Sequence, residues 1–282
     1  MNAVSRTIFS LQRILFALPF SATAKTVKRE LLAKFRQPAE RSATPVEPHP
    51  FDRVYGTDTS GRASHDQLRS GKRSDVFNVG YAGSQPSVIR KALSQIPCPR
   101  EATFVDLGCG KGRALVVASE FPFPRIIGVE LSPLLAQVAR ANAAKVARRF
   151  PERSEIRIVE DDALSFEIPR GTTVIYMYNS FHRRVMKGVV ERIRGVATGS
   201  KIFVVYYNPV HFDLLDGCPE FARFYVDKIA FDDAERAAAI FDNDQESVVI
   251  WQSIGPPMCA ALPGADSTIV VTVPGFGAEV LK

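Results

Sequence analysis

The chain has 282 residues, 46% of them hydrophobic, which is enough to bury the core of one α/β domain with extensions. Its four cysteines and four histidines are scattered without paired spacing, so we expect a reducing compartment, no disulfide framework and no metal site. The formal charge of +6 resides entirely in residues 1–36, and the neutral remainder lacks the overall charge typical of nucleic-acid binding.

Residues 1–36 are predicted to be a basic amphipathic segment. Apolar side chains recur in it at helical spacing: Ile8, Leu11, Ile14, Leu15 and Leu18. Its longest apolar run is too short to span a bilayer, so the helix is expected to contact an anionic membrane surface or to pack on the domain. A small-residue motif at residues 22–24 and the acid-poor composition leave export and organelle import as alternatives to a cytoplasmic location.

Residues 37–50 are predicted to be a linker, because they contain four prolines and almost no large apolar residue. Residues 51–100 are predicted to open the folded domain. Their first part, up to residue 83, is rich in glycine, serine and charge and is interpreted as a lid loop, with a disordered arm as the alternative. Apolar spacing then predicts a helix over residues 84–96.

Residues 102–118 organise the rest of the chain. A short apolar run leads to Gly108, Gly110 and Gly112 and then to a second apolar run, which predicts a strand, a tight turn and the start of a helix. This unit typically holds a nucleotide-like cofactor at the carboxyl end of a strand. Asp106, two residues before Gly108, is expected to point its carboxylate into that site.

The acidic residues near the turn select among cofactors. A dinucleotide would place its pyrophosphate at the turn, where the Asp106 carboxylate would repel it. S-adenosylmethionine instead carries an ammonium group, which a carboxylate binds through a charge-assisted hydrogen bond. Glu130 ends the next apolar run, at about the distance where an acid binds ribose hydroxyls in such sites. The pattern therefore predicts S-adenosylmethionine as the cofactor.

The two segments VDLGCGKGR and IIGVELS resemble the first signature segments of the class I S-adenosylmethionine-dependent methyltransferases. The resemblance implies a methyltransferase whose core spans residues 101–282. Its expected fold is a doubly wound α/β architecture with a mostly parallel seven-stranded sheet and an antiparallel C-terminal strand pair. A non-catalytic cofactor-binding scaffold or sensor and an NAD(P)-dependent enzyme are the alternatives.

The resemblance also implies roles for residues outside the glycine turn. Tyr81 lies at the start of the helix that resembling enzymes bring over the methionine end of the cofactor, although it is equally well interpreted as a packing residue. Asp162, with Asp161 second, matches the acid that accepts a hydrogen bond from the adenine amino group. Either side chain can instead cap the turn that follows.

The strand predicted over residues 172–178 ends at Asn179, where class I methyltransferases place the acceptor atom. The chain lacks the two prolines of the Asn-Pro-Pro-aromatic motif and resembles the Asn-x-Phe variant of nucleosomal lysine methyltransferases. That resemblance favours a nitrogen acceptor, in a protein or a small molecule. His182 is a candidate base, with an ordinary loop or core histidine as the alternative.

Two further β-rich runs, residues 246–254 and 267–274, are predicted to form the antiparallel pair that closes the sheet.

Overall fold

The structure is a computed structural model that describes residues 48–63, 80–238, 244–255, 269–273 and 277–281. The predictions for the basic segment 1–36, its membrane contact included, and for most of the linker 37–50 lie outside the described residues. Within the described part of the chain, no helix combines the length and the apolarity that crossing a membrane requires.

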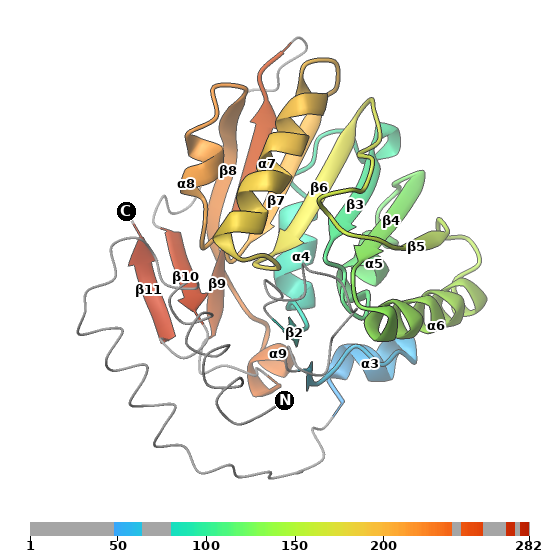
Figure 1. The fold of residues 1–282 in the computed structure, drawn as a ribbon. Coiled ribbons are helices and arrows are strands. Elements are labelled where there is room, and N and C mark those ends of the chain that lie inside the picture. The colour runs from blue at the N-terminus through green and yellow to red at the C-terminus, as the bar shows by residue number, and fades with distance from the viewer. Residues whose placement is uncertain (1–47, 64–79, 239–243, 256–268, 274–276, 282) are drawn as a thin grey trace, which may run out of the picture.

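A seven-stranded sheet forms the centre of the molecule (Figure 1). Across the sheet the strands follow the order β5 (Ile156–Glu160), β4 (Arg125–Glu130), β3 (Thr103–Leu107), β6 (Thr173–Tyr178), β7 (Ile202–Tyr207), β9 (Gln245–Ser253) and β8 (Phe221–Ala230). The first five strands are mutually parallel, and β9 runs antiparallel to both of its neighbours, β7 and β8. The predicted fold class is confirmed.

The strands of the closing pair differ from those predicted. Residues 246–254 do lie in the sheet as β9, but their partner is β8, and the prediction of residues 267–274 as that partner was wrong. The described part of that run forms β10 (Ile269–Val273), which pairs with β11 (Gly277–Leu281) in a separate two-stranded sheet. A register shift between Arg223 and Tyr225 interrupts the alternation of β8, so its sequence carries a weak strand pattern.

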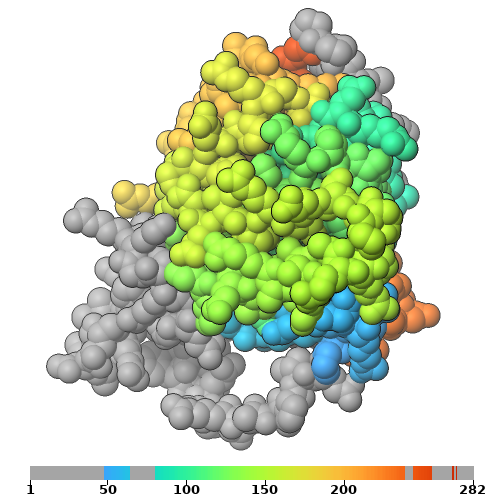
Figure 2. Space-filling view, turned by 90° about the vertical axis from the view of Figure 1, so that its right-hand side faces the viewer, coloured from blue at the N-terminus to red at the C-terminus, as the bar shows by residue number. Residues whose placement is uncertain are grey.

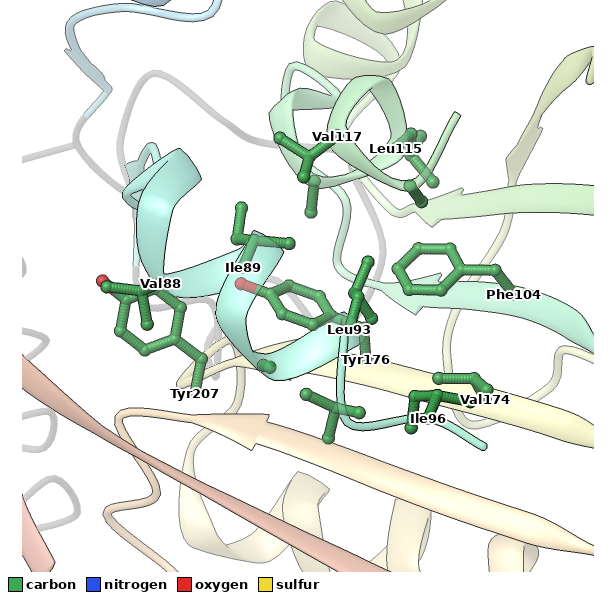
Figure 3. Packing of buried hydrophobic residues seen from close by; sticks show 14 of the residues in the cluster. Val88, Ile89, Leu93, Ile96, Phe104, Leu115, Val117, Val174, Tyr176 and Tyr207 are labelled. Atoms are coloured by element: carbon green, nitrogen blue, oxygen red, sulfur yellow. The ribbon is translucent and has the colours of Figure 1, made fainter. Parts of the chain in front are cut away.

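Alternate side chains of the strands point to opposite faces, and helices bury both faces. One face packs against α4 (Pro86–Leu93), α5 (Arg113–Ala118) and α6 (Pro133–Arg149), and the other against α7 (Arg183–Ala197) and α8 (Asp213–Asp216). Figure 1 shows α7 in front of the sheet and α4 behind it. In Figure 3, Ile89 and Leu93 of α4 lie over Tyr176 and Phe104 of the sheet.

An N-terminal arm, residues 48–63, packs beside α6, as Figure 2 shows in blue. It begins with α3 (Pro50–Tyr55), so the lid loop predicted over residues 51–83 starts as a helix. Local sequence gave little sign of this helix because tertiary contacts hold it: the Tyr55 ring packs on Phe150 and its hydroxyl donates to Glu120 Oε1 at 2.6 Å. The arm ends in β1 (Arg62–Ala63), which pairs with β2 (Tyr81–Ala82).

Short elements complete the chain: the 3₁₀ turn η3 (Pro99–Glu101) before β3, and α9 (Asp233–Ala237) between β8 and β9. From α9, the buried Glu235 reaches the N-terminus of α4, where its carboxylate accepts the Ser87 backbone N–H at 2.7 Å and the Ser87 hydroxyl. This carboxylate satisfies a backbone donor that has no partner inside the helix. The connection between β8 and β9 is thereby fixed to the helix that precedes the glycine turn.

Replacing Glu235 should therefore destabilise the domain. We expect Glu235→Ala to lower the free energy of unfolding by about 1–3 kcal/mol, because it leaves a buried N–H without an acceptor. Denaturant unfolding followed by circular dichroism measures this change. Asp233→Ala, an exposed position on the same helix, is the matched control and should have little effect. Equal unfolding curves for the two variants would contradict the capping role.

Candidate functional site

The glycine turn lies between β3 and α5, at the carboxyl end of the parallel strands. Gly108, Gly110 and Gly112 adopt φ angles of 81°, 56° and 86°, a left-handed region that a residue with a Cβ rarely enters. The Gly108 and Cys109 N–H groups donate to the Val129 carbonyl at 2.9 and 3.0 Å, which holds the turn against β4. The predicted strand, turn and helix are present.

Glu130 fastens the turn from the end of β4. One carboxylate oxygen accepts the Gly110 N–H at 2.8 Å and the other accepts the Ser132 N–H at 2.8 Å. The side chain is buried, and burial raises the pKa of Glu130 despite these backbone hydrogen bonds. Each oxygen retains a lone pair, so the carboxylate can also accept ribose hydroxyls. Glu130 thus supports the turn in addition to the predicted cofactor contact.

Asp106 lies near the end of β3, opposite Gly128 in β4 and Tyr176 in β6. Its side chain is only 3% exposed, and no hydrogen bond from any residue that the structure describes reaches its carboxylate. Burial, together with the negative charge of Glu130, holds the pKa of Asp106 well above its usual range. A cation placed beside this carboxylate would relieve that unfavourable environment, as the ammonium of S-adenosylmethionine would.

Tyr81 covers the glycine turn. A Cβ built on Gly110 would lie 2.4 Å from Cε2 of the Tyr81 ring, so the ring contacts the turn where a side chain would otherwise stand. Its hydroxyl donates to the Thr59 carbonyl at 2.6 Å, and burial raises the pKa of Tyr81. The structure therefore brings Tyr81, predicted from its place before α4, to the cofactor turn. Its hydroxyl and ring both have protein partners, as the packing interpretation expects.

The loop after β6 meets the same turn from the other side. A Cβ built on Gly108 would lie 2.7 Å from Cβ of Ser180 and 3.7 Å from the Phe181 ring. Asn179 adopts a left-handed backbone with φ of 36°, which is uncommon outside glycine and is often found at functional sites. No hydrogen bond within the described ranges involves its side-chain amide. With respect to these ranges, the amide is available to a ligand.

Asp161 and Asp162 follow β5, next to the end of β4. The Asp161 N–H donates to the Glu130 carbonyl at 3.1 Å, which places this turn beside Glu130, the residue that holds the glycine turn. Both side chains cap the local backbone: Asp161 accepts from the Asp162 N–H at 2.7 Å and Asp162 accepts from the Leu164 N–H at 2.9 Å. Each carboxylate keeps a second oxygen outside these bonds, so the capping interpretation and the adenine contact are compatible.

His182 begins α7 as its N-cap, and its Nδ1 accepts the Arg184 N–H at 3.3 Å. While Nδ1 accepts this hydrogen bond, the neutral ring carries its proton on Nε2, so His182 can receive a proton only at Nδ1, by giving up the capping bond. His211, on the loop after β7, is buried near His182 and Arg183, and it was not identified as a candidate from the sequence. Burial and the charge of Arg183 lower the pKa of His211 to about 4, so this ring is neutral at physiological pH.

Among the residues that the structure describes, no group of three His, Cys, Asp or Glu side chains has the arrangement needed to hold a metal ion.

The residues present fit S-adenosylmethionine. The turn has no side chain of its own at Gly108, Gly110 and Gly112, and Asp106 offers a buried carboxylate that lacks a hydrogen bond from the described residues. Asp106 would hold the ammonium of the methionine portion, and Glu130 would hold the ribose. A pyrophosphate would instead add negative charge beside two buried acids.

Comparison with known proteins supports a family assignment. The sequence profile of a family described as "Histone methylation protein DOT1" matches residues 67–207, which is half of the chain. Among curated proteins, none matches this sequence significantly.

Solved structures show similar folds at low identity. TrmN from Thermus thermophilus is 15% identical with a TM-score of 0.43, covering 60% of this chain and 48% of TrmN. An RNA methyltransferase from Salinibacter ruber in complex with S-adenosyl-L-homocysteine is 16% identical with a TM-score of 0.39, covering 64% of this chain and 99% of that one. Magnesium protoporphyrin IX methyltransferase from Synechocystis PCC 6803 with bound SAM is 11% identical with a TM-score of 0.40, covering 60% and 77%. The chain thus spans about half the length of TrmN, and TM-scores this low carry no argument about function.

The Asp106 carboxylate should make cofactor binding pH-dependent. Its pKa is raised in the free protein, and a bound ammonium favours the ionised form, so binding releases a proton. Affinity should therefore rise as the pH rises through this pKa and fall as the pH is lowered. Calorimetry with S-adenosylhomocysteine, which carries the same ammonium, measures both the affinity and the proton release.

Asp106→Asn should weaken this binding by about 1–3 kcal/mol and abolish the proton release. Asp227→Asn, at another buried carboxylate in β8, is the matched control and should bind normally. A variant at Asp106 with wild-type affinity and wild-type pH dependence would remove this carboxylate from the cofactor site.

Glu130→Ala should reduce cofactor affinity and folding stability together. The change removes the acceptor of two buried N–H groups as well as the ribose contact, and we expect about 1–3 kcal/mol for each property. Glu130→Gln retains one side-chain acceptor, so its affinity and stability should lie between those of the wild type and Glu130→Ala. Paired calorimetry and denaturant unfolding test this expectation, and a loss of affinity at unchanged stability would contradict the support of the turn.

Proposed function

We propose a function from one premise: the chain belongs to the family of the histone methylation protein DOT1 and is an S-adenosylmethionine-dependent methyltransferase. Within that activity, we infer that the acceptor is a nitrogen atom, with a protein lysine side chain favoured over a small molecule. The description of the family as histone methylation proteins supports a protein acceptor. The loop from Asn179 to Phe181 supports a nitrogen.

The protein contributes binding and alignment. S-adenosylmethionine supplies the reactive methyl group on its sulfonium. Asp106 and Glu130 would hold the methionine and ribose portions, Tyr81 would cover the turn beneath them, and Asp162 or Asp161 would accept from adenine. None of these roles requires a protein nucleophile, because methyl transfer by in-line displacement depends chiefly on orientation and on exclusion of water.

The Asn179 side chain carries the proposal for the acceptor. It follows β6, which lies next to β3 and its glycine turn, and its neighbour Ser180 packs directly on Gly108. Its backbone is left-handed, and its amide lacks a hydrogen bond within the described part of the chain. Its carbonyl oxygen would accept an N–H of the acceptor amine and so direct the nitrogen lone pair towards the methyl group.

His182 is proposed as the group that receives a proton from a charged acceptor amine, at Nδ1, which then gives up its hydrogen bond to the Arg184 N–H. A cytoplasmic location and contact of residues 1–36 with an anionic membrane are also proposals. The first is supported by the absence of a cysteine framework in the sequence, and the second by the charge of that segment.

Asn179 should matter for transfer more than for cofactor affinity. We expect Asn179→Ala to bind S-adenosylhomocysteine nearly as well as the wild type and to lower turnover by about tenfold or more. Asn179→Gly removes the same amide without adding strain at the positive φ, so it should show the same loss and separate the side chain from the backbone. Full turnover in Asn179→Gly would show that the side chain has no part in transfer and that Asn179 only shapes the loop.

The acceptor itself is tested with S-adenosylmethionine labelled on the methyl group. The protein is incubated with purified histones and, separately, with protein, nucleic-acid and small-molecule fractions of a lysate. We expect label in protein, on lysine after hydrolysis to amino acids, and less of it with Asp106→Asn at the same subsaturating cofactor concentration. Label confined to nucleic acid or to small molecules would overturn the proposed acceptor while leaving the methyltransferase activity intact.

A further inference from the structure

Arg113 is a buried cation that directly follows the glycine turn. It is the first residue of α5, and only 4% of it is exposed. Its guanidinium donates to three neutral oxygens: Nε to Thr59 Oγ1 at 2.8 Å, and its two terminal nitrogens to the Thr59 carbonyl at 2.9 Å and the Ser84 carbonyl at 3.1 Å. No carboxylate among the described residues pairs with it directly. A buried charge without an opposite charge is unfavourable, so its retention needs a reason.

The three hydrogen bonds join three separate parts of the chain. Thr59 belongs to the N-terminal arm, and its hydroxyl donates in turn to Asp52 Oδ1 at 2.7 Å. Ser84 ends the segment that runs from Tyr81 to α4, and its hydroxyl accepts from Tyr176 in β6 at 3.0 Å. Arg113 itself belongs to the turn. The planar fork of the guanidinium holds these parts at fixed spacing, which a flexible ammonium cannot do.

The backbone beside Arg113 leaves no room for a side chain. A Cβ built on Gly83 would lie 2.6 Å from Cζ of Arg113 and 2.6 Å from one of its terminal nitrogens. The guanidinium therefore lies against the backbone of the segment that carries Tyr81. Because the Tyr81 hydroxyl also donates to the Thr59 carbonyl, Arg113 and Tyr81 share one acceptor.

We propose that Arg113 is a positioning residue for the cofactor site. It sets the distance between the glycine turn and the covering segment of residues 81–84, and so holds the Tyr81 ring over Gly110. It acts through Thr59, Gly83 and Ser84, so its effect falls on cofactor affinity. This inference rests on the cofactor site alone and is independent of the proposed acceptor.

The test measures S-adenosylhomocysteine binding by calorimetry on full-length protein, well below the melting temperature of each variant. Arg113→Gln should weaken binding by about tenfold or more and raise KM for S-adenosylmethionine, with kcat nearly unchanged. Arg113→Lys retains the charge but not the fork, and should weaken binding by a similar factor. Arg90→Gln is the control: Arg90 lies on α4 and pairs with Glu120, and this variant should bind as the wild type does.

A double-mutant cycle separates positioning from general stability. Gly83→Ala should weaken binding in the wild type by displacing the guanidinium, and should add little in the Arg113→Gln background, where that group is gone. Thr59→Val, which removes only the hydroxyl partner of Nε, provides a milder variant if Arg113→Gln does not fold. It should also weaken binding.

Unchanged affinity in a folded Arg113→Gln protein, or in Thr59→Val where only that variant folds, would overturn the proposal. Full affinity in Arg113→Lys would assign the effect to charge, and additive effects of the Gly83 and Arg113 changes would show that the two residues act separately. Either result would also overturn it. Loss of methyl transfer to histones at normal cofactor affinity would bear on the proposed acceptor instead.

Discussion

The backbone of the cofactor site approaches its neighbours so closely that no Cβ fits between them, and the rest of the site depends on this constraint. At Gly108 the neighbour is Ser180, and at Gly110 it is the Tyr81 ring. The third such contact is between Gly83 and the Arg113 guanidinium. Two segments that are distant in sequence, one with Tyr81 and Gly83 and one with Ser180, therefore meet at the glycine turn, and the glycines allow this close approach.

Two buried acids beside this turn have different environments. Glu130 receives backbone N–H groups on both oxygens, whereas the Asp106 carboxylate receives none from the described residues. A buried carboxylate without a partner is unfavourable by several kcal/mol, more than one charged hydrogen bond of about 1–3 kcal/mol contributes. The Asp106 carboxylate is therefore a group whose environment a bound cation would improve. This property, more than the glycine pattern, distinguishes the site from one for a pyrophosphate.

The features predicted from sequence are those encoded locally. Asp106 and the glycines lie within seven residues, and Glu130 ends the next strand, so spacing alone placed them. Arg113 was missed because its partner Thr59 lies 54 residues away, and Glu235 was missed because Ser87 lies 148 residues away. Strand β8 was missed because its register shift breaks the alternation on which strand prediction depends. Long-range hydrogen bonds leave no periodic signal in the sequence.

The contact at Gly108 links cofactor binding to transfer. Methyl transfer requires the acceptor atom to lie in line with the bond that breaks, and small displacements reduce its rate strongly. Ser180 and Phe181 pack on Gly108, and Asn179 precedes them with a left-handed backbone. The loop after β6 is therefore positioned by the same turn that would bind the cofactor. A side chain at position 108 would displace both the cofactor and the loop that faces the methyl acceptor. Gly108 therefore contributes to the alignment of the two reactants.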